Sequence, residues 1–206
     1  MKKLNILFFI LITLVLSHCI TYPKNDFPIY NPAKIDKKIS GINFVVSYKP
    51  YDAFGNLYKI NQNVHLANRQ AFTQIISNCN CMKDFNLYIE GLDDLSELKG
   101  KNLVRIEITT KPIINAKFIT STFLFAITAF LFPTIDDIYA KTEFIAYSQG
   151  KEIKRYTYEN EIVEIRGLLI LFVRPFTENN YITNLNVPDN FLNDIYRDKL
   201  YPMELK

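Results

Sequence analysis

The side chains that could carry chemistry in this chain are few, and cysteine is the most informative of them. The 206 residues include three cysteines and two histidines. Cys79 and Cys81 are separated by one residue, so in an oxidising compartment they form either a disulfide or two neighbouring thiols. A metal centre needs more ligands, and the one histidine beyond the N-terminal segment, His65, is predicted to be an exposed helix residue. The sequence therefore predicts no metal and no other cofactor.

Two pairs of neighbouring carboxylates are the other candidates for chemistry. Asp93 with Asp94, and Asp136 with Asp137, could divide acid and base roles if their pKa values were split. Such pairs occur far more often in solvated turns. The sequence has no turn motif for a nucleophilic serine, and its six glycines form no phosphate-binding loop. A secreted hydrolase that uses acidic residues is therefore the least favoured function.

The N-terminus has the layout of an export signal. Lys2 and Lys3 precede a largely apolar run over residues 4–16, which is followed by Ser17 and His18. As a helix this run would be roughly 20 Å long, against roughly 30 Å for the hydrocarbon core of a bilayer. The pattern predicts a signal peptide over residues 1–18.

The residues that end this segment, Leu16, Ser17, His18 and Cys19, resemble a bacterial lipobox. Leucine and serine fit the pattern, whereas histidine occupies a position where a small residue is usual. The looser boxes of spirochaete-type envelope lipoproteins are similar. The resemblance implies that Cys19 becomes the mature N-terminus and carries fatty acyl chains such as palmitate, and two such chains give stable membrane anchoring. The alternative is a signal segment that is not cleaved and itself remains as the anchor.

Composition limits the partners of the exported chain. Without Lys2 and Lys3, 22 basic side chains remain against 21 acidic ones, a net charge of about +1. No basic run is dense enough to follow a phosphate backbone, so we expect no nucleic-acid partner. Residues 19–40 contain three prolines and predict an extended tether between membrane and domain. No acidic residue directly follows Cys19, which resembles the pattern of outer-membrane lipoproteins in well-studied diderm bacteria.

The remaining residues, 41–206, predict a single α+β domain. We expect an antiparallel sheet with one amphipathic helix packed on it, a C-terminal helix and an apolar mid-chain segment. Gln149 and Gly150 lie between two strand-like segments and predict a tight hairpin turn. The expected strands are 41–48, 85–90, 103–110, 141–148 and 151–159, and the expected helices are 63–77 and 188–200.

The apolar mid-chain segment, residues 113–133, permits three interpretations. Residues 118–132 carry no charge, and as a helix they would reach roughly 22 Å. The segment is a transmembrane span of an integral membrane protein, a helix or hairpin that dips into a membrane, or a buried core element. Residues 167–173 are likewise either a buried strand or a segment that contacts a membrane.

These patterns favour a lipid-anchored envelope lipoprotein that acts as a non-catalytic binding or assembly module, with membrane lipid and an envelope protein as partners. We expect it in the outer membrane. An integral membrane protein with a span at 113–133 is the alternative. Exposed apolar side chains would make the contact with lipid or with the partner protein. Those expected to do so are Phe118, Phe123, Phe125, Phe130, Leu168, Leu169, Leu171 and Phe172.

Overall fold

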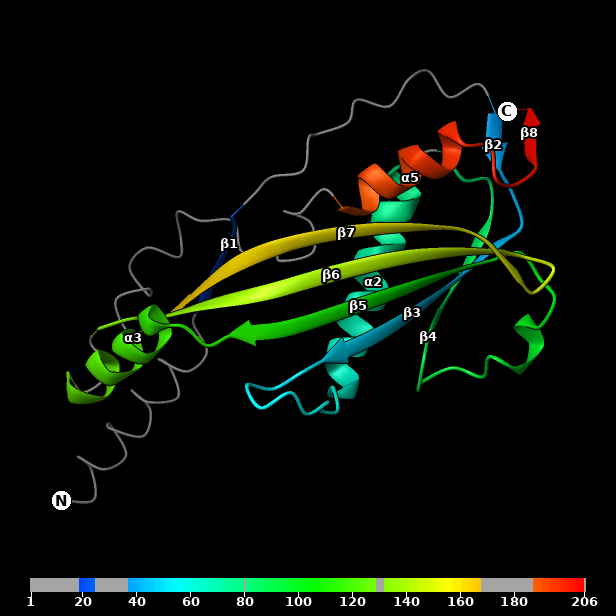
Figure 1. The fold of residues 1–206 in the computed structure, drawn as a ribbon. Coiled ribbons are helices and arrows are strands. Elements are labelled where there is room, and N and C mark those ends of the chain that lie inside the picture. Colours follow the sequence, from blue (N-terminus) through cyan, green and yellow to red (C-terminus); the bar gives the residue numbers. More distant parts are fainter. Residues whose placement is uncertain (1–18, 25–36, 80, 129–131, 168–186, 206) are drawn as a thin grey trace, which may run out of the picture.

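The computed structural model describes residues 19–24, 37–79, 81–128, 132–167 and 187–205, and these form an α+β fold. Figure 1 shows a long, twisted sheet with two helices against one face and a third helix beyond one end. In chain order the elements are β1 (Cys19–Pro23), β2 (Lys37–Ile39), β3 (Ile42–Pro50), α2 (Gln62–Asn78), β4 (Phe85–Ile89), the short 3-10 helix η1 (Ser96–Leu98), β5 (Leu103–Ile113), α3 (Ala116–Ile127), β6 (Thr134–Ser148), β7 (Lys151–Arg166), α5 (Val187–Arg197) and β8 (Met203–Leu205).

The main sheet is mixed, which corrects the prediction of an antiparallel sheet. Its strand order is β1-β7-β6-β5-β3-β4, and β3 runs parallel to both of its neighbours, β4 and β5. The reason is the helix that follows β3. Helix α2 carries the chain back along the sheet, so β4 starts at the same end as β3 and must run in the same direction. The other pairings in this sheet are antiparallel.

Strands β6 and β7 form the predicted hairpin, and both strands are longer than expected. Gln149 and Gly150 connect them with φ angles of 50° and 78°. Positive φ at both positions matches the right-handed twist of the strands, and glycine adopts it without steric cost. The register runs from the pair Ser148 and Lys151 at the turn to the pair Thr134 and Arg166 at the far end. This hairpin is the longest continuous element of the fold.

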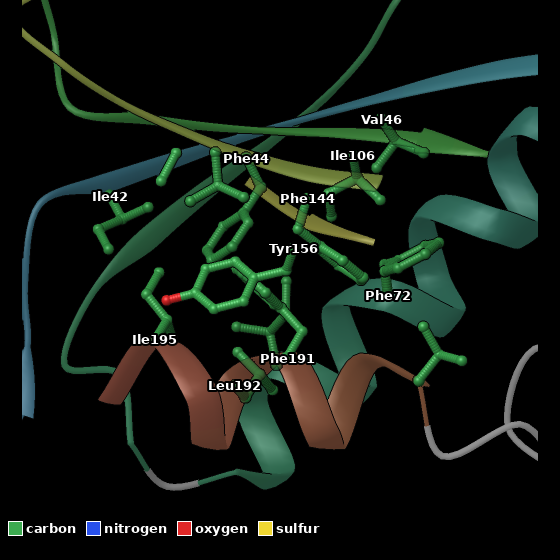
Figure 2. Packing of buried hydrophobic residues seen from close by; sticks show 14 of the residues in the cluster. Ile42, Phe44, Val46, Phe72, Ile106, Phe144, Tyr156, Phe191, Leu192 and Ile195 are labelled. Carbon is green, nitrogen blue, oxygen red and sulfur yellow. The ribbon is translucent and has the colours of Figure 1, made fainter. Parts of the chain in front are cut away.

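The hydrophobic core lies between the sheet and helices α2 and α5 (Figure 2). The ring of Phe191 on α5 stacks on that of Phe144 of β6, with 3.9 Å between centroids. Tyr156 of β7 contacts the Phe191 ring edge-on. Phe72 of α2 is only 1% exposed. Helix α5, which overlaps the expected helix 188–200, buries an apolar stripe at helical spacing that includes Phe191, Leu192 and Ile195. The core therefore occupies the part of the sheet that these two helices cover.

The cover supplied by α2 is shorter than its sequence pattern predicts. The helix begins after Asn61, whose side chain accepts a hydrogen bond from the Asn63 N–H, as expected for a capping residue. Phe72 and Ile76 in its second half are buried, whereas Val64 in its first turn is 47% exposed. The second half of α2 therefore supplies the part of the helix that packs in the core.

The sheet also includes residues from the stretch that we expected to be a tether. Cys19–Pro23 form β1, which pairs with β7 at the edge of the sheet. Lys37–Ile39 form β2, which pairs with β8 in a separate two-stranded sheet. Ile20 is 1% exposed, so this edge strand contributes an apolar side chain to the interior.

Candidate functional site

One end of the sheet brings together the features that bear on function. Cys19 pairs with Arg166 of β7, and Arg166 pairs with Thr134 of β6, so these three residues lie side by side across neighbouring strands. Helix α3 lies at the same end, just before β6 begins (Figure 1). We call this region, made of Cys19, Thr134, Arg166 and α3, the Cys19 end.

Helix α3 starts directly after β5 because Asn115 caps it. The Asn115 side chain accepts a hydrogen bond from the Phe118 N–H at 2.9 Å, which satisfies one of the free first-turn donors. The helix has 12 residues, so it is about 18 Å long. Among the residues that the structure describes, no helix has the length and apolar character to cross a membrane. Of the segment 113–133, the structure describes the end of β5, helix α3 and residues 132–133.

Helix α3 has one buried residue and leaves three large apolar side chains exposed. Its buried residue is Ser121, whose hydroxyl accepts a hydrogen bond from the Ile135 N–H at 3.0 Å and donates to the Phe118 carbonyl at 3.1 Å. Ile119, Phe123 and Ile127 are 60%, 64% and 61% exposed. Their spacing of four residues places them in one stripe along the helix. We call these three side chains the α3 stripe.

Two buried carboxylates fix α3 and the strand ends to each other, which corrects the expectation that Asp136 and Asp137 occupy a solvated turn. Both lie in β6 and are 3% and 5% exposed. Asp137 accepts from Lys117 Nζ at 3.0 Å and from Asn115 Nδ2 at 2.8 Å, and Lys24 Nζ lies 3.5 Å away. Asp136 pairs with Arg166.

The pKa of Asp137 shows how this cluster behaves. Burial raises the pKa of its carboxyl, but the hydrogen bonds from Lys117 and Asn115 and the charges of Lys117 and Lys24 outweigh burial and leave it below the ordinary value. Successive side chains in a strand point to opposite faces. Asp136 and Asp137 therefore have separate basic partners and are not arranged as two carboxylates facing one substrate.

A groove opens on the covered face of the sheet where the helices end. It encloses about 600 Å³ and lies between loop 51–61, the first turns of α2 and the sheet. Three tyrosines contribute to its wall, and Lys111 Nζ lies 4.9 Å from the centroid of the Tyr51 ring. Its floor includes apolar side chains of β5 and β6, and Arg166 brings its lining to the Cys19 end. The residues used in this description are Tyr48, Tyr51, Tyr58, Ile108, Ile138 and Arg166.

The lining of this groove suits binding by contact with rings and charges. Aromatic faces and apolar floor residues exclude water, while Lys59, Asp52 and Glu164 offer both signs of charge at its wall. His65, which we expected to be exposed, is half-buried in α2, with its ring 6.2 Å from that of Tyr48. In the described parts of the chain, no three His, Cys, Asp or Glu side chains form a group that could hold a metal.

The predicted contact residues divide into three groups. Phe123 is exposed in the α3 stripe, whereas Phe118 and Phe125 on the same helix are half-buried. Phe130 lies outside the described residues, as do Leu168, Leu169, Leu171 and Phe172 and most of the segment 167–173.

Cys79 and Cys81 are joined by a disulfide just after α2, with Cα atoms 5.1 Å apart.

Sequence reasoning missed the groove and the position of Cys19 within the sheet. The groove residues come from four separate parts of the chain, and no local pattern links them. A signal for β1 was present, because Ile20, Thr21 and Tyr22 have strong strand propensity. The three prolines between residues 19 and 40 outweighed it in our interpretation.

No protein-family model matches this chain, and no curated protein matches it in sequence. Among solved structures, it is similar to a chain described as a homolog of neuraminyllactose-binding hemagglutinin from Helicobacter pylori, with 11% identity, a TM-score of 0.36, and 84% of this chain and 91% of that chain covered. It is also similar to a minor lipoprotein from Acinetobacter baumannii, with 11% identity, a TM-score of 0.36, and coverage of 79% and 96%. Likenesses of this degree carry no function from one protein to another.

Proposed function

We propose that this protein is a lipid-anchored lipoprotein of the cell envelope, in the outer membrane, that acts as a non-catalytic binding or assembly module. The observation that supports this most directly is the register of β1. Cys19, the residue that the lipobox-like motif marks for acylation, is the first residue of a strand that pairs with β7. An acyl anchor at Cys19 would therefore attach to the sheet itself, without a long spacer.

This attachment has a mechanical consequence. Acyl chains contribute about 0.8 kcal/mol for each CH₂ group buried in lipid, so two chains hold a protein at the bilayer for long periods. Because Cys19 is paired with Arg166, the anchored end would be the end that also carries α3. The groove lined by Tyr48, Tyr51 and Tyr58, whose lining also includes Arg166, is the surface we assign to binding.

Mass spectrometry of the mature N-terminus tests the anchor. We expect a chain that starts at Cys19 with two or three acyl groups, recovered with the membrane fraction and enriched in outer-membrane fractions on a density gradient. Cys19→Ser should remove the acylation and shift the protein out of the membrane fraction or leave its signal peptide uncleaved.

The double variant Cys79→Ser/Cys81→Ser is the matched control, because it removes two other cysteines and leaves Cys19 in place. It should be acylated like the unaltered chain. An unmodified N-terminus in the unaltered protein, or its recovery in buffer without detergent, would contradict the proposal.

A further inference from the structure

We infer that α3 is an interfacial membrane helix, and that its stripe of Ile119, Phe123 and Ile127 inserts into the bilayer that holds the N-terminus. The inference deepens the proposed function and rests on it for the membrane, but it concerns a second and separate contact. A lipid anchor alone leaves a domain free to tilt. An anchor together with an inserted helix fixes which way the sheet faces.

Helix α3 buries a serine and exposes large apolar side chains. The helix turns the hydroxyl of Ser121 toward β6 and leaves three large apolar side chains more than half exposed. Exposed apolar side chains that occur singly need no explanation, but a continuous stripe of them on one helix indicates a contact. The stripe would be covered by whatever lies beyond this end of the molecule.

The N-terminal segment, which joins the sheet at the same end, indicates that lipid covers the α3 stripe. The largely apolar run over residues 4–16 leads into Cys19, which pairs with Arg166 beside the start of β6. Whether that run is removed and replaced by acyl chains or is retained, a membrane-seeking group joins the sheet at the Cys19 end. The α3 stripe is therefore next to the bilayer in either case.

Two threonine hydroxyls of the α3 segment already have hydrogen-bond partners within it. The hydroxyl of Thr120 donates to the Ala116 carbonyl at 2.8 Å, and that of Thr128 donates to the Leu124 carbonyl at 2.6 Å. Hydroxyls bonded within the helix can enter lipid without losing water partners. Lys117, the charged residue of α3, is in the first turn and pairs with Asp137. At about 18 Å, the helix suits a position in the plane of the interface.

Helix α3 is bonded to β6, so the orientation of the helix fixes that of the sheet. Asn115 caps the helix and donates to Asp137, Lys117 bonds the same carboxylate, and Ser121 bonds the β6 backbone. These contacts connect the first two turns of α3 to β6. A helix attached in this way cannot rotate in the interface without rotating the sheet.

The chain contains no tryptophan, which allows a direct test with single reporters. Phe123→Trp places one in the α3 stripe, and Ile153→Trp is the matched control, because Ile153 is 44% exposed on β7 near the hairpin turn. Each full-length variant is reconstituted into phosphatidylethanolamine and phosphatidylglycerol vesicles with or without acyl chains brominated near the head group, and only protein that floats with the vesicles is measured.

We expect brominated lipid to quench the emission of Phe123→Trp at least twofold, with a blue-shifted maximum, and to leave Ile153→Trp unchanged. Equal, weak quenching of both reporters in floated protein would overturn the inference. A blue shift at position 123 without quenching would also overturn it, because a protein surface would then cover the stripe.

Mass spectrometry of the same samples separates this inference from the proposed function. Quenching at position 123 with an uncleaved signal segment retains the α3 contact and rejects the lipoprotein anchor. An acylated Cys19 without quenching at position 123 retains the lipoprotein anchor and rejects the α3 contact. Protein that does not float contradicts both. Circular dichroism of each variant checks that the substituted chain keeps the unaltered fold.

Discussion

The two halves of the sheet treat apolar side chains in opposite ways. Under α2 and α5, Phe144 and Phe191 stack in the interior, and charged residues of the neighbouring strand β7, such as Lys154 and Arg155, are exposed. At the Cys19 end, Asp136, Asp137 and Ser121 are buried, and Ile119, Phe123 and Ile127 are exposed. In the first half the protein itself excludes water from its apolar groups. In the second, Ile20 of β1 is buried, but the three side chains of the α3 stripe are exposed.

This contrast teaches that apolar content alone does not locate a core. The mid-chain segment is among the most apolar in the sequence, yet α3 has one buried residue, a serine. A helix is stabilised by burial of a face against other elements. The hydrogen bonds and the ion pair between α3 and β6 come from its first two turns. Because Ile119, Phe123 and Ile127 are exposed, these three side chains stabilise the fold little.

The largest expected effect comes from truncating one phenylalanine in each half. Phe191→Ala should lower the free energy of unfolding by about 3–5 kcal/mol, because it leaves a cavity against Phe144 and Tyr156. Phe123→Ala should change it by less than about 0.5 kcal/mol, because that side chain is already exposed. Urea denaturation followed by far-UV circular dichroism measures both, and similar losses in the two variants would remove the distinction between the halves.

A smaller effect is expected from the polar interior of the Cys19 end. Asp137→Ala removes the acceptor for Lys117 and Asn115 and should cost about 1–3 kcal/mol of unfolding free energy. The matched variant is Asp94→Ala. Its carboxylate accepts from Ser96 in an exposed turn, so the loss should be clearly smaller. If the two variants lose the same amount in urea denaturation, the buried cluster does not hold this end together.

The smallest of these effects is a dependence on acid in the covered half. Hydrogen bonds from Lys154 and Tyr156 lower the pKa of Asp198 to about 2, from an ordinary value of 3.8. A carboxyl whose pKa is lower in the folded state stabilises the fold above its unfolded-state pKa, and this stabilisation is lost as the pH falls toward the folded value.

We therefore expect a loss of stability between about pH 4 and pH 2, and Asp198→Asn should reduce the slope of that loss. Thermal unfolding measured in steps of pH tests this. An identical slope in the unaltered chain and the variant would mean that other carboxyls account for the acid sensitivity. Asp198 and its partners lie in the half of the sheet that α2 and α5 cover, so the unaltered chain and the variant have the same Cys19 end.

Local patterns predicted the elements whose stability is local. The hairpin depends on Gln149 and Gly150 at the turn, and α5 has an apolar stripe on one side and polar residues on the other. The parallel pairing of β3 and the pairing of β1 with β7 could not be predicted in this way. Both join residues that lie far apart in the chain, and strand propensity does not specify a partner.

The candidate site was harder to predict, for a different reason. Residues 118–132 are uncharged and apolar at all but four positions, so no clear period separated one face from another, and helix, strand and span remained open. The cap at Asn115 was a usable signal for a helix start. The burial of Asp137 had no such signal, because it depends on Lys24 and Lys117 arriving from two other elements.

The length of the β6–β7 hairpin sets how far this molecule extends. At about 3.3 Å per residue, the 16 residues of β7 measure roughly 50 Å from end to end. Cys19 is level with one end, at Arg166, and the turn at Gln149 and Gly150 forms the other. In an upright molecule this turn stands several nanometres above the head groups. An inserted tag at that loop is then within reach of an antibody, and one beside Pro133 is shielded by the membrane surface.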